Sequence, residues 1–254
     1  METKFFVDRL SIIITVFFEF SLGSYRFGID QFSMDINKYN VYSGPNIGLY
    51  TAVNDKQVFV PNGFAKTTAK KLASYLDVDT VYTSMANTRL LGVMMVINNQ
   101  GVLLPSNVSQ HEYDLIKKST GLNVDILDSK HNALGNLICA NDKGAIVSPM
   151  IPKEQMKKIE DVLGVEVIQK KVAGYHQVGV VIVATMQGGV IHPEADDDEI
   201  KTISNVLGVN IEPATINGGI PYVNSGILAN NHNMVVGYHT AGPEIMMLTR
   251  AFSG

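Results

Sequence analysis

Residues 133–149 read ALGNLICANDKGAIVSP, and this stretch decides the fold. An apolar run ends at Ala140, four turn-forming residues follow at 141–144, and a second apolar run stops just before Pro149. Gly144, at the fourth place of the turn, accepts a positive φ without steric cost. Short apolar runs bounded by turn signals are typical of buried strands. The stretch therefore predicts a tight hairpin of two buried strands.

The hairpin pattern recurs five times along the chain. The residues that follow the second apolar run are spaced 44 apart, and they are Pro61, Pro105, Pro149, Pro193 and Gly237. The turns begin at intervals of 44, 43, 44 and 45 residues, at Asn54, Asn98, Asn141, Thr185 and Asn230. A repeat of this length sets the whole architecture. Gln57 breaks the pattern at the fourth turn position, so we expect the first turn to differ or to be strained.

A helix is predicted after each proline. In copies three and four the apolar positions recur 44 residues apart and form one helical stripe, at 156, 159, 162 and 163 and again at 200, 203, 206 and 207. Ser109 and Glu112 have the spacing of a capping box, while Gly164 and Gly208 suit helix ends. The acidic run 196–199 indicates a capped helix start or, alternatively, a cation site. Each unit therefore reads strand, turn, strand, helix, strand.

Five copies without an atypical terminal copy favour closure into a ring, which removes open sheet edges. We place unit boundaries near residues 85, 129, 172 and 217. No linker divides the repeats, so residues 36–254 are predicted to form a single five-repeat domain. Residues 1–35 are then an N-terminal extension outside that fold.

The extension permits three interpretations. Lys4, Arg9 and the apolar run 10–18 resemble a secretory signal, but residues 21–24 make a poor cleavage site. The run is short for a membrane span, and Glu19 interrupts it. The third interpretation, which we favour, is that translation begins at Met34. The lack of a persuasive export signal predicts a cytoplasmic protein without a membrane partner.

Composition excludes some classes of protein. The chain has 254 residues, a formal net charge of −4 and a single cysteine, Cys139. One cysteine cannot form a disulfide framework or a thiolate metal cluster, which favours a reducing compartment. The net charge gives no sign of a protein held mainly to nucleic-acid phosphates. Paired lysines near the helices would add a weak attraction to RNA, or they only solvate helix faces; they are Lys70, Lys71, Lys117, Lys118, Lys157, Lys158, Lys170 and Lys171.

The stretch from Ala133 to Val147 resembles the central signature of the translation initiation factor 6 family, the ribosome anti-association factors. Further stretches with the same resemblance are Pro45–Gly48, Val190–Pro193, Ala214–Asn217 and Thr240–Glu244. The resemblance runs through all five units, over about residues 36–252, and the chain length is similar to the archaeal form. Asn224, in place of a usual glycine, and Thr185–Met186 depart from the family pattern.

The resemblance implies a pentein-type five-bladed α/β propeller with pseudo-fivefold symmetry, built from five repeats of about 44 residues. It implies a monomer without cofactor or metal that binds the large ribosomal subunit and prevents its association with the small subunit. A role in large-subunit biogenesis would follow. The main partner would be a ribosomal protein beside the sarcin–ricin loop, with rRNA contact left open.

The alternative is an enzyme, because the pentein fold also includes hydrolases and transferases of guanidino groups. Such an enzyme needs a reactive cysteine, and Cys139 lies in an apolar run that predicts a buried, inert thiol. The six histidines do not cluster at metal-ligand spacing. The sequence therefore favours a binding protein over an enzyme.

The resemblance also suggests where the partner docks. It places Asn136, the amide of the Leu-Gly-Asn motif, on the docking rim. A polar amide at a strand start otherwise needs a local backbone partner. The corresponding positions of other units join it in the predicted docking set, although the apolar ones suit the core equally well; they are Arg89, Leu90, Val93, His176, Val178 and Tyr222.

Overall fold

The computed structural model describes residues 34–253, and the following account concerns these residues. The predictions made above for residues 1–33 lie outside the described residues. Within the described part, five units follow one another in sequence. The element order in each is a short helix, two strands joined by a turn, a longer helix and, in the first four units, a third strand.

The third unit, which contains the stretch 133–149, shows this order. Its elements are α5 (Leu134–Leu137), β8 (Ile138–Ala140), β9 (Gly144–Val147), the 3-10 helix η1 (Lys153–Gln155), α6 (Met156–Leu163) and β10 (Glu166–Gln169). The predicted hairpin is confirmed, because β8 and β9 pair antiparallel with Ile138 opposite Val147. The predicted helix end at Gly164 is also confirmed, with a left-handed φ of 65°.

The other units contain matching elements. Unit one has α1 (Ile47–Tyr50), β2 (Ala52–Val53), β3 (Gln57–Pro61), α2 (Lys66–Leu76) and β4 (Asp79–Thr83). Unit two has α3 (Leu91–Met94), β5 (Val96–Ile97), β6 (Gly101–Pro105), α4 (Gln110–Thr120) and β7 (Asn123–Leu127). Unit four has α7 (Val178–Val181), β11 (Ile182–Ala184), β12 (Gly189–Ile191), α8 (Asp197–Leu207) and β13 (Ile211–Pro213). Unit five has the 3-10 helix η2 (Val223–Ser225), β14 (Ile227–Ala229), β15 (Asn233–Gly237) and α9 (Gly242–Ala251).

The short helices were missed by the sequence analysis. The run Val93–Ile97 reads as one continuous strand, yet its first two residues belong to α3 and only Val96–Ile97 form β5. Short apolar runs do not distinguish a buried strand from a buried helix by periodicity alone. A single helical turn of four residues leaves no periodic signal at all.

Each of the five sheets has three strands. The second strand lies in the middle, pairs antiparallel with the first strand across the hairpin turn, and pairs parallel with the third. The parallel partner is reached through the longer helix, as a parallel crossover requires.

The fifth sheet is completed from the other end of the chain. Unit five has no third strand of its own, and β1 (Asp35–Tyr39) takes that place beside β15, with Asp35 opposite Asn233 and Tyr39 opposite Gly237. The N-terminal strand therefore joins the last unit to the first. This pairing has a sequence separation of nearly the whole described chain, and no local pattern announces it.

The predicted fold class must be corrected. The structure is a mixed α/β fold with five small three-stranded sheets, and its units are not five like blades of a pentein-type propeller in pseudo-fivefold symmetry. One sheet takes its third strand from the N-terminal end of the described residues. Unit five begins with the 3-10 helix η2, in which Asn224 stands where α1, α3, α5 and α7 have glycine. Unit three divides its long helix into η1 and α6, whereas the long helix of each other unit is one α-helix.

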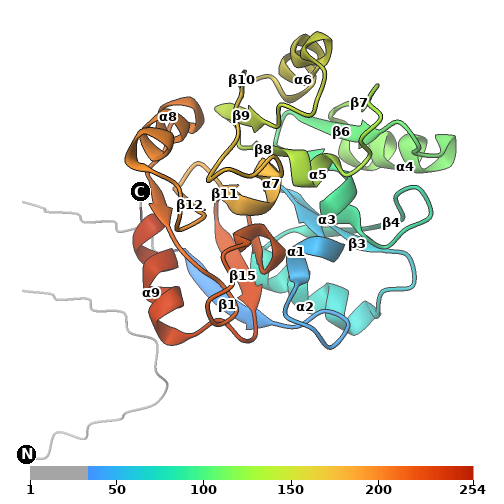
Figure 1. Cartoon of the computed structure of the whole chain (residues 1–254). Helices are drawn as coiled ribbons and strands as arrows, with labels where there is room; N and C mark the ends of the chain where they lie inside the picture. Colours follow the sequence, from blue (N-terminus) through green and yellow to red (C-terminus); the bar gives the residue numbers. More distant parts are fainter. Residues whose placement is uncertain (1–33, 254) are drawn as a thin grey trace, which may run out of the picture. The chain divides into compact units, whose positions relative to one another are not determined.

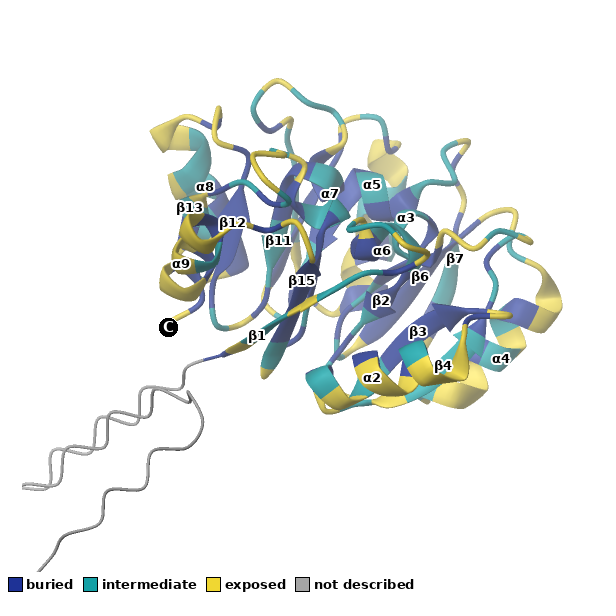
Figure 2. Ribbon diagram, turned by 90° about the horizontal axis from the view of Figure 1, so that it is seen from below, coloured by how far each residue is buried: buried dark blue, intermediate teal, exposed yellow. Residues whose placement is uncertain are grey.

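The hydrophobic core lies between units. Each of five buried clusters combines side chains of two neighbouring units, and together they connect one to two, two to three, three to four, four to five and five back to one. Leu228 and Val235 of unit five, for example, share a cluster with Leu72 of unit one. Figure 1 shows the short helices grouped centrally with the longer helices around them, and Figure 2 shows the buried strands between. No unit can bury its apolar surface alone.

The five short helices form a closed ring, in which each contacts the next and η2 contacts α1. We call α1, α3, α5, α7 and η2 the short-helix ring. Its packing requires glycine, since a Cβ on Gly92 would lie 1.9 Å from the carbonyl oxygen of Gly48. The same contact links Gly135 to Gly92 and Gly179 to Gly135. The backbone itself therefore forms the contact surface of the ring.

The hairpin turns form a second ring at the opposite end of the strands. Asn98 accepts backbone hydrogen bonds from residues 100 and 101 of its own turn through Oδ1, and its Nδ2 donates to the carbonyl of Asn141 in the next unit. The turns of Asn54, Asn141 and Asn230 are held in the same way. The recurring asparagine therefore joins neighbouring units.

The reason proposed above for the turn glycines was wrong. Of the glycines at the fourth turn position, only Gly188 has a positive φ, of 155°. Gly101 and Gly144 are needed because a Cβ would lie 1.9 and 2.1 Å from carbonyl oxygens of the next unit's helix. Gln57 fits the first turn without a positive φ, and its side-chain amide donates to the carbonyl of Ser119 in α4.

Candidate functional site

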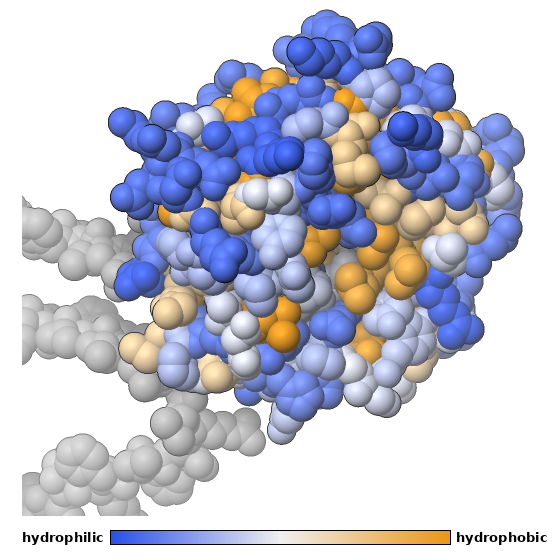
Figure 3. Space-filling model, in the orientation of Figure 1, coloured by the Kyte–Doolittle hydropathy of each residue, from blue (hydrophilic) through white to orange (hydrophobic). Residues whose placement is uncertain are grey.

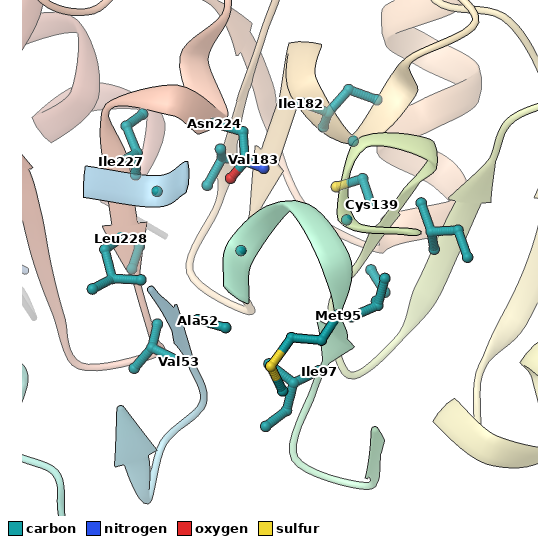
Figure 4. Close-up of a pocket in the computed structure, with 18 of the residues that line it drawn as sticks. Ala52, Val53, Met95, Ile97, Cys139, Ile182, Val183, Asn224, Ile227 and Leu228 are labelled. Atoms are coloured by element: carbon teal, nitrogen blue, oxygen red, sulfur yellow. The ribbon is translucent and has the colours of Figure 1, made fainter. Parts of the chain in front are cut away.

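The short-helix ring forms the centre of one face of the described domain. The third residue of each short helix is half-buried at this centre; these residues are Leu49, Val93, Asn136, Val180 and Ser225. Behind them the strands enclose a narrow cavity of about 130 Å³, and Figure 4 shows its lining, with Ala52, Met95 and Cys139 among the labelled side chains. The lining consists of glycines and apolar side chains of different sizes, with Thr51 and Asn224 as its polar residues, and it offers few groups to orient a substrate.

Five loops surround the ring and lead into the short helices. We call them the approach loops, and they comprise residues 40–46, 84–90, 128–133, 170–177 and 214–222. Four of them contain a tight turn closed by a backbone bridge, as between Met85 and Thr88. These turns include non-glycine residues with positive φ, among them Tyr42, Ala86 and Asn87.

The structure brings the sequence-predicted docking residues to this face. Arg89 and Leu90 are exposed at the start of α3, and Tyr222 is exposed at the start of η2. His176 is half-buried in the approach loop before α7. His176 and Tyr222 lead into the neighbouring elements α7 and η2, whereas Arg89 and Leu90 lead into α3, which contacts neither of them in the ring.

Asn136 lies on the third position of α5, and Val93 occupies the same position of the neighbouring α3. The backbone amide of Asn136 donates to the carbonyl of Ala133. Within residues 34–253 its half-buried side-chain amide has no hydrogen-bond partner. An amide with an unused donor and acceptor beside an apolar ring suits recognition of a partner's backbone.

Val178 differs from the rest of the predicted set. Its side chain is 0% exposed and belongs to a buried cluster with Val172 and Val181. It therefore supports the ring from inside, and we remove it from the docking set.

Aromatic residues missed by the sequence analysis extend the face on two sides. Tyr42, exposed in the first approach loop, packs against Tyr50 and Phe64, and the guanidinium of Arg89 lies 5.7 Å from its ring centroid. This contact joins the loops of units one and two. Figure 3 shows apolar side chains exposed near the centre of this face between polar surroundings.

On the other side, Tyr175, His192 and Tyr222 join units four and five, with ring centroids 5.0 to 6.3 Å apart. The nearby Tyr222 hydroxyl raises the pKa of the Tyr175 phenol. Exposed tyrosines are frequent at protein interfaces because they combine apolar area with a polar end. In the sequence, the recurrence of tyrosine in the approach loops was the signal that could have identified these residues.

The lysine pairs contribute little to this face. Three pairs lie on α2, α4 and α6, and only Lys170–Lys171 lies in an approach loop, with Arg89 and Lys130 the other cations of these loops. The face is therefore mainly apolar and aromatic, with a few basic groups at its edge.

The residues considered for enzyme chemistry do not assemble. Burial raises the pKa of the Cys139 thiol to about 12, although a backbone hydrogen bond with Ala184 acts in the opposite direction. Within the described residues, no group of three or more His, Cys, Asp or Glu side chains could hold a metal ion. The acidic run 196–199 caps α8, since Asp196 accepts from the backbone of Glu199. No helix in the described part could cross a membrane.

The chain is similar to a family of known proteins over almost all of the described residues. Residues 36–251 match the model of the eIF-6 family. The translation initiation factor 6 of Cenarchaeum symbiosum is 64% identical over 221 residues, which cover 87% of this chain and 100% of that protein. The factor of Nitrosopumilus maritimus is 66% identical, covering 86% and 99% respectively. The factor of Pyrococcus furiosus is 43% identical, covering 86% and 98%.

The match to a solved structure, "C. Jejuni Agmatine Deiminase", covers 62% of this chain and 59% of that chain, at 14% identity and a TM-score of 0.39. A TM-score this low does not support placing the chain in that enzyme's structural class.

Proposed function

Since this chain belongs to the eIF-6 family, we propose that it is a translation initiation factor that binds the large ribosomal subunit and prevents association with the small subunit. The observation that carries the proposal is the family match over residues 36–251, which includes the whole short-helix ring. A role in large-subunit biogenesis follows if the factor binds before subunits join.

The docking surface in this proposal is the short-helix face, with Asn136 at its centre. Its support is chemical: Asn136 has an unused amide, Val93 and Leu90 supply apolar contact, and Arg89 and Tyr222 lie toward the edge. Buried aromatic and arginine side chains carry much of the binding energy in protein interfaces. We propose a ribosomal protein beside the sarcin–ricin loop as the main partner, with rRNA contact limited to Arg89, Lys130 and the Lys170–Lys171 pair.

The protein acts without catalysis in this proposal, as a monomer in the cytoplasm. The buried thiol of Cys139, with its raised pKa, gives no nucleophile at neutral pH. Steric occupation of the joining face would suffice for the activity.

Co-sedimentation with separated subunits tests the proposal. Wild-type protein should pellet with large subunits and not with small ones. Asn136→Ser should weaken binding on the order of 10- to 100-fold, because a lost interface hydrogen bond costs about 1–3 kcal/mol. Asn210→Ser, at the exposed opposite end of the strands, is the matched control and should bind as wild type. Pelleting with small subunits only, or with neither, would exclude the function.

A further inference from the structure

Glu112 connects a long helix to an approach loop. It is the third residue of α4 and only 4% exposed. Its carboxylate accepts hydrogen bonds from the amide and hydroxyl of Ser109 at 2.9 Å, as the helix cap requires. The same carboxylate also accepts from the Ser84 hydroxyl at 2.8 Å and from the backbone amides of Ala86 and Asn87 at 3.0 and 3.3 Å. One side chain therefore satisfies donors from two segments.

The turn that Glu112 holds is intrinsically unfavourable. Ala86 has a φ of 49° and Asn87 a φ of 59°, a region that disfavours alanine in particular. Two successive residues in this conformation direct both backbone amides to one side, where one anion can accept a hydrogen bond from each. Arg89 and Leu90, two members of the proposed docking set, follow this turn directly.

Glu244 repeats the arrangement in unit five. It is 6% exposed and accepts from Ala241 at the start of α9 at 2.7 Å. It also accepts from the amides of Gly218 and Gly219 at 2.9 and 2.8 Å and from the Thr215 hydroxyl at 2.8 Å. Tyr222 lies three residues beyond Gly219.

Unit four has a similar arrangement with fewer hydrogen bonds. The Glu199 carboxylate accepts one hydrogen bond, at 3.1 Å, from the backbone amide of Ala173 in the loop that leads to His176. In units one and three the corresponding helix positions are Thr68 and Gln155, which carry no carboxylate. The two buried carboxylates, Glu112 and Glu244, therefore hold the approach loops that carry Arg89, Leu90 and Tyr222, and the half-buried Glu199 contacts the loop that carries His176.

We propose that Glu112 and Glu244 are positioning residues for partner docking, because each holds an approach loop in the conformation that presents the docking residues. This inference rests on the proposed function. The carboxylate is the required group: two acceptor oxygens face amide and hydroxyl donors only, and a glutamine would turn an NH₂ donor toward them.

The ionisation of both groups agrees with this role. Burial acts to raise the pKa of Glu112, but the hydrogen bonds from Ser109, Ser84 and Asn87 outweigh it and hold the pKa below its ordinary value. Burial likewise acts to raise the pKa of Glu244, and the hydrogen bonds from Ala241, Gly218, Gly219 and Thr215 lower it overall. Both side chains are thus charged acceptors when the loops are in place.

The test compares Glu112→Gln with Glu166→Gln, an equal change of charge at the exposed start of β10. Binding to purified large subunits is measured by pelleting, and hydrogen–deuterium exchange is measured over residues 84–90. Glu112→Gln should weaken binding by at least about 10-fold, since buried donors lose their acceptor. Exchange in residues 84–90 should become faster, while Glu166→Gln should match wild type in both measurements.

A rescue separates positioning from general damage. Adding Ala86→Gly and Asn87→Gly to Glu112→Gln supplies residues that accept positive φ, and it should restore part of the binding. If Glu112→Gln does not fold, Glu244→Gln is compared with wild type over residues 215–222, with the same direction of change but a smaller loss of binding expected, because Gly218 and Gly219 already accept positive φ.

The outcomes are distinct. Unchanged binding, or weakened binding without faster exchange in the loop, would overturn the positioning role. Wild-type protein that does not bind large subunits would overturn the proposed function, and the exchange data would then still decide whether Glu112 holds the loop.

Discussion

At the scale of single residues, the acidic side chains of this protein show how one group can serve two structural needs. Ser109 and Glu112 are recognisable in sequence as a capping box, and the structure confirms it. The sequence does not show that the same carboxylate also binds Ala86 and Asn87, because the turn lies about 25 residues earlier in the chain.

The lowered pKa values of Glu112 and Glu244 predict a specific acid dependence of stability. Where the folded pKa lies below the unfolded value, the unfolded chain binds more protons in between. The stabilisation is therefore complete above the unfolded glutamate pKa of about 4.3, and it is lost as the pH falls through the folded values. We expect the melting temperature of wild type to fall over this range, and that of Glu112→Gln to fall less steeply. If thermal melts show that the melting temperatures of wild type and Glu112→Gln fall equally as the pH is lowered, the prediction is contradicted.

At the scale of elements, β1 connects the two ends of the described chain by completing the fifth sheet. Its five residues pair with β15, Ile36 packs against the cluster that contains Leu248 and Phe252, and buried Met34 belongs to the same cluster. Without β1, the edge of β15 would be unpaired and this cluster opened to water.

Truncation should separate β1 from the residues before it. A chain that begins at Met34 should melt within about 4 °C of the full chain, which corresponds to roughly 1 kcal/mol for a domain of this size. A chain that begins at Asn40 loses β1 and the burial of Met34 and Ile36, worth about 1.5–3 kcal/mol per side chain. We expect its melting temperature to fall by about 10 °C or more, or the chain not to fold. Circular dichroism melts of the two truncated chains decide the matter, and equal stability would show that β1 is dispensable.

At the scale of the whole described domain, stability comes from contacts between units. The five hydrophobic clusters each join two units, and the short-helix ring closes through backbone contacts between glycines. Local unfolding of one unit would expose both of its neighbouring clusters. The described domain should therefore unfold in a single cooperative transition.

Gly92→Ala tests this closure. The added Cβ would lie 1.9 Å from the carbonyl oxygen of Gly48 and 2.5 Å from that of Thr51, and neither backbone group can move without disturbing the ring. We expect a loss of about 1–3 kcal/mol or more from overpacking, seen as a lower midpoint of one urea transition. Gly242→Ala is the control, because nothing lies within 4 Å of its added Cβ. Equal midpoints for the two variants would show that the ring is not tightly packed.

The amino-acid sequence by itself determined the local pattern of this protein. The five turns, the strands beside them, the capping box at Ser109 and the glycine helix ends follow from spacing and residue type, since each depends on neighbours within a few residues. The motif around Asn136 and the resemblance it carries also identified the family. The part of the candidate site that could be predicted was the set of positions at the starts of α3, α5, α7 and η2.

Only the tertiary structure decided how the units close and what faces a partner. β1 completes the fifth sheet, Gly92 and Gly101 are required by backbones that approach from other units, and Glu112 reaches a turn far away in sequence. Val178 and Val93 look alike in sequence, yet one is buried and the other half-buried because they occupy different positions of their short helices. These features depend on contacts between distant segments. Sequence patterns miss them because residue type and spacing within one element do not show which distant backbone or side chain approaches it.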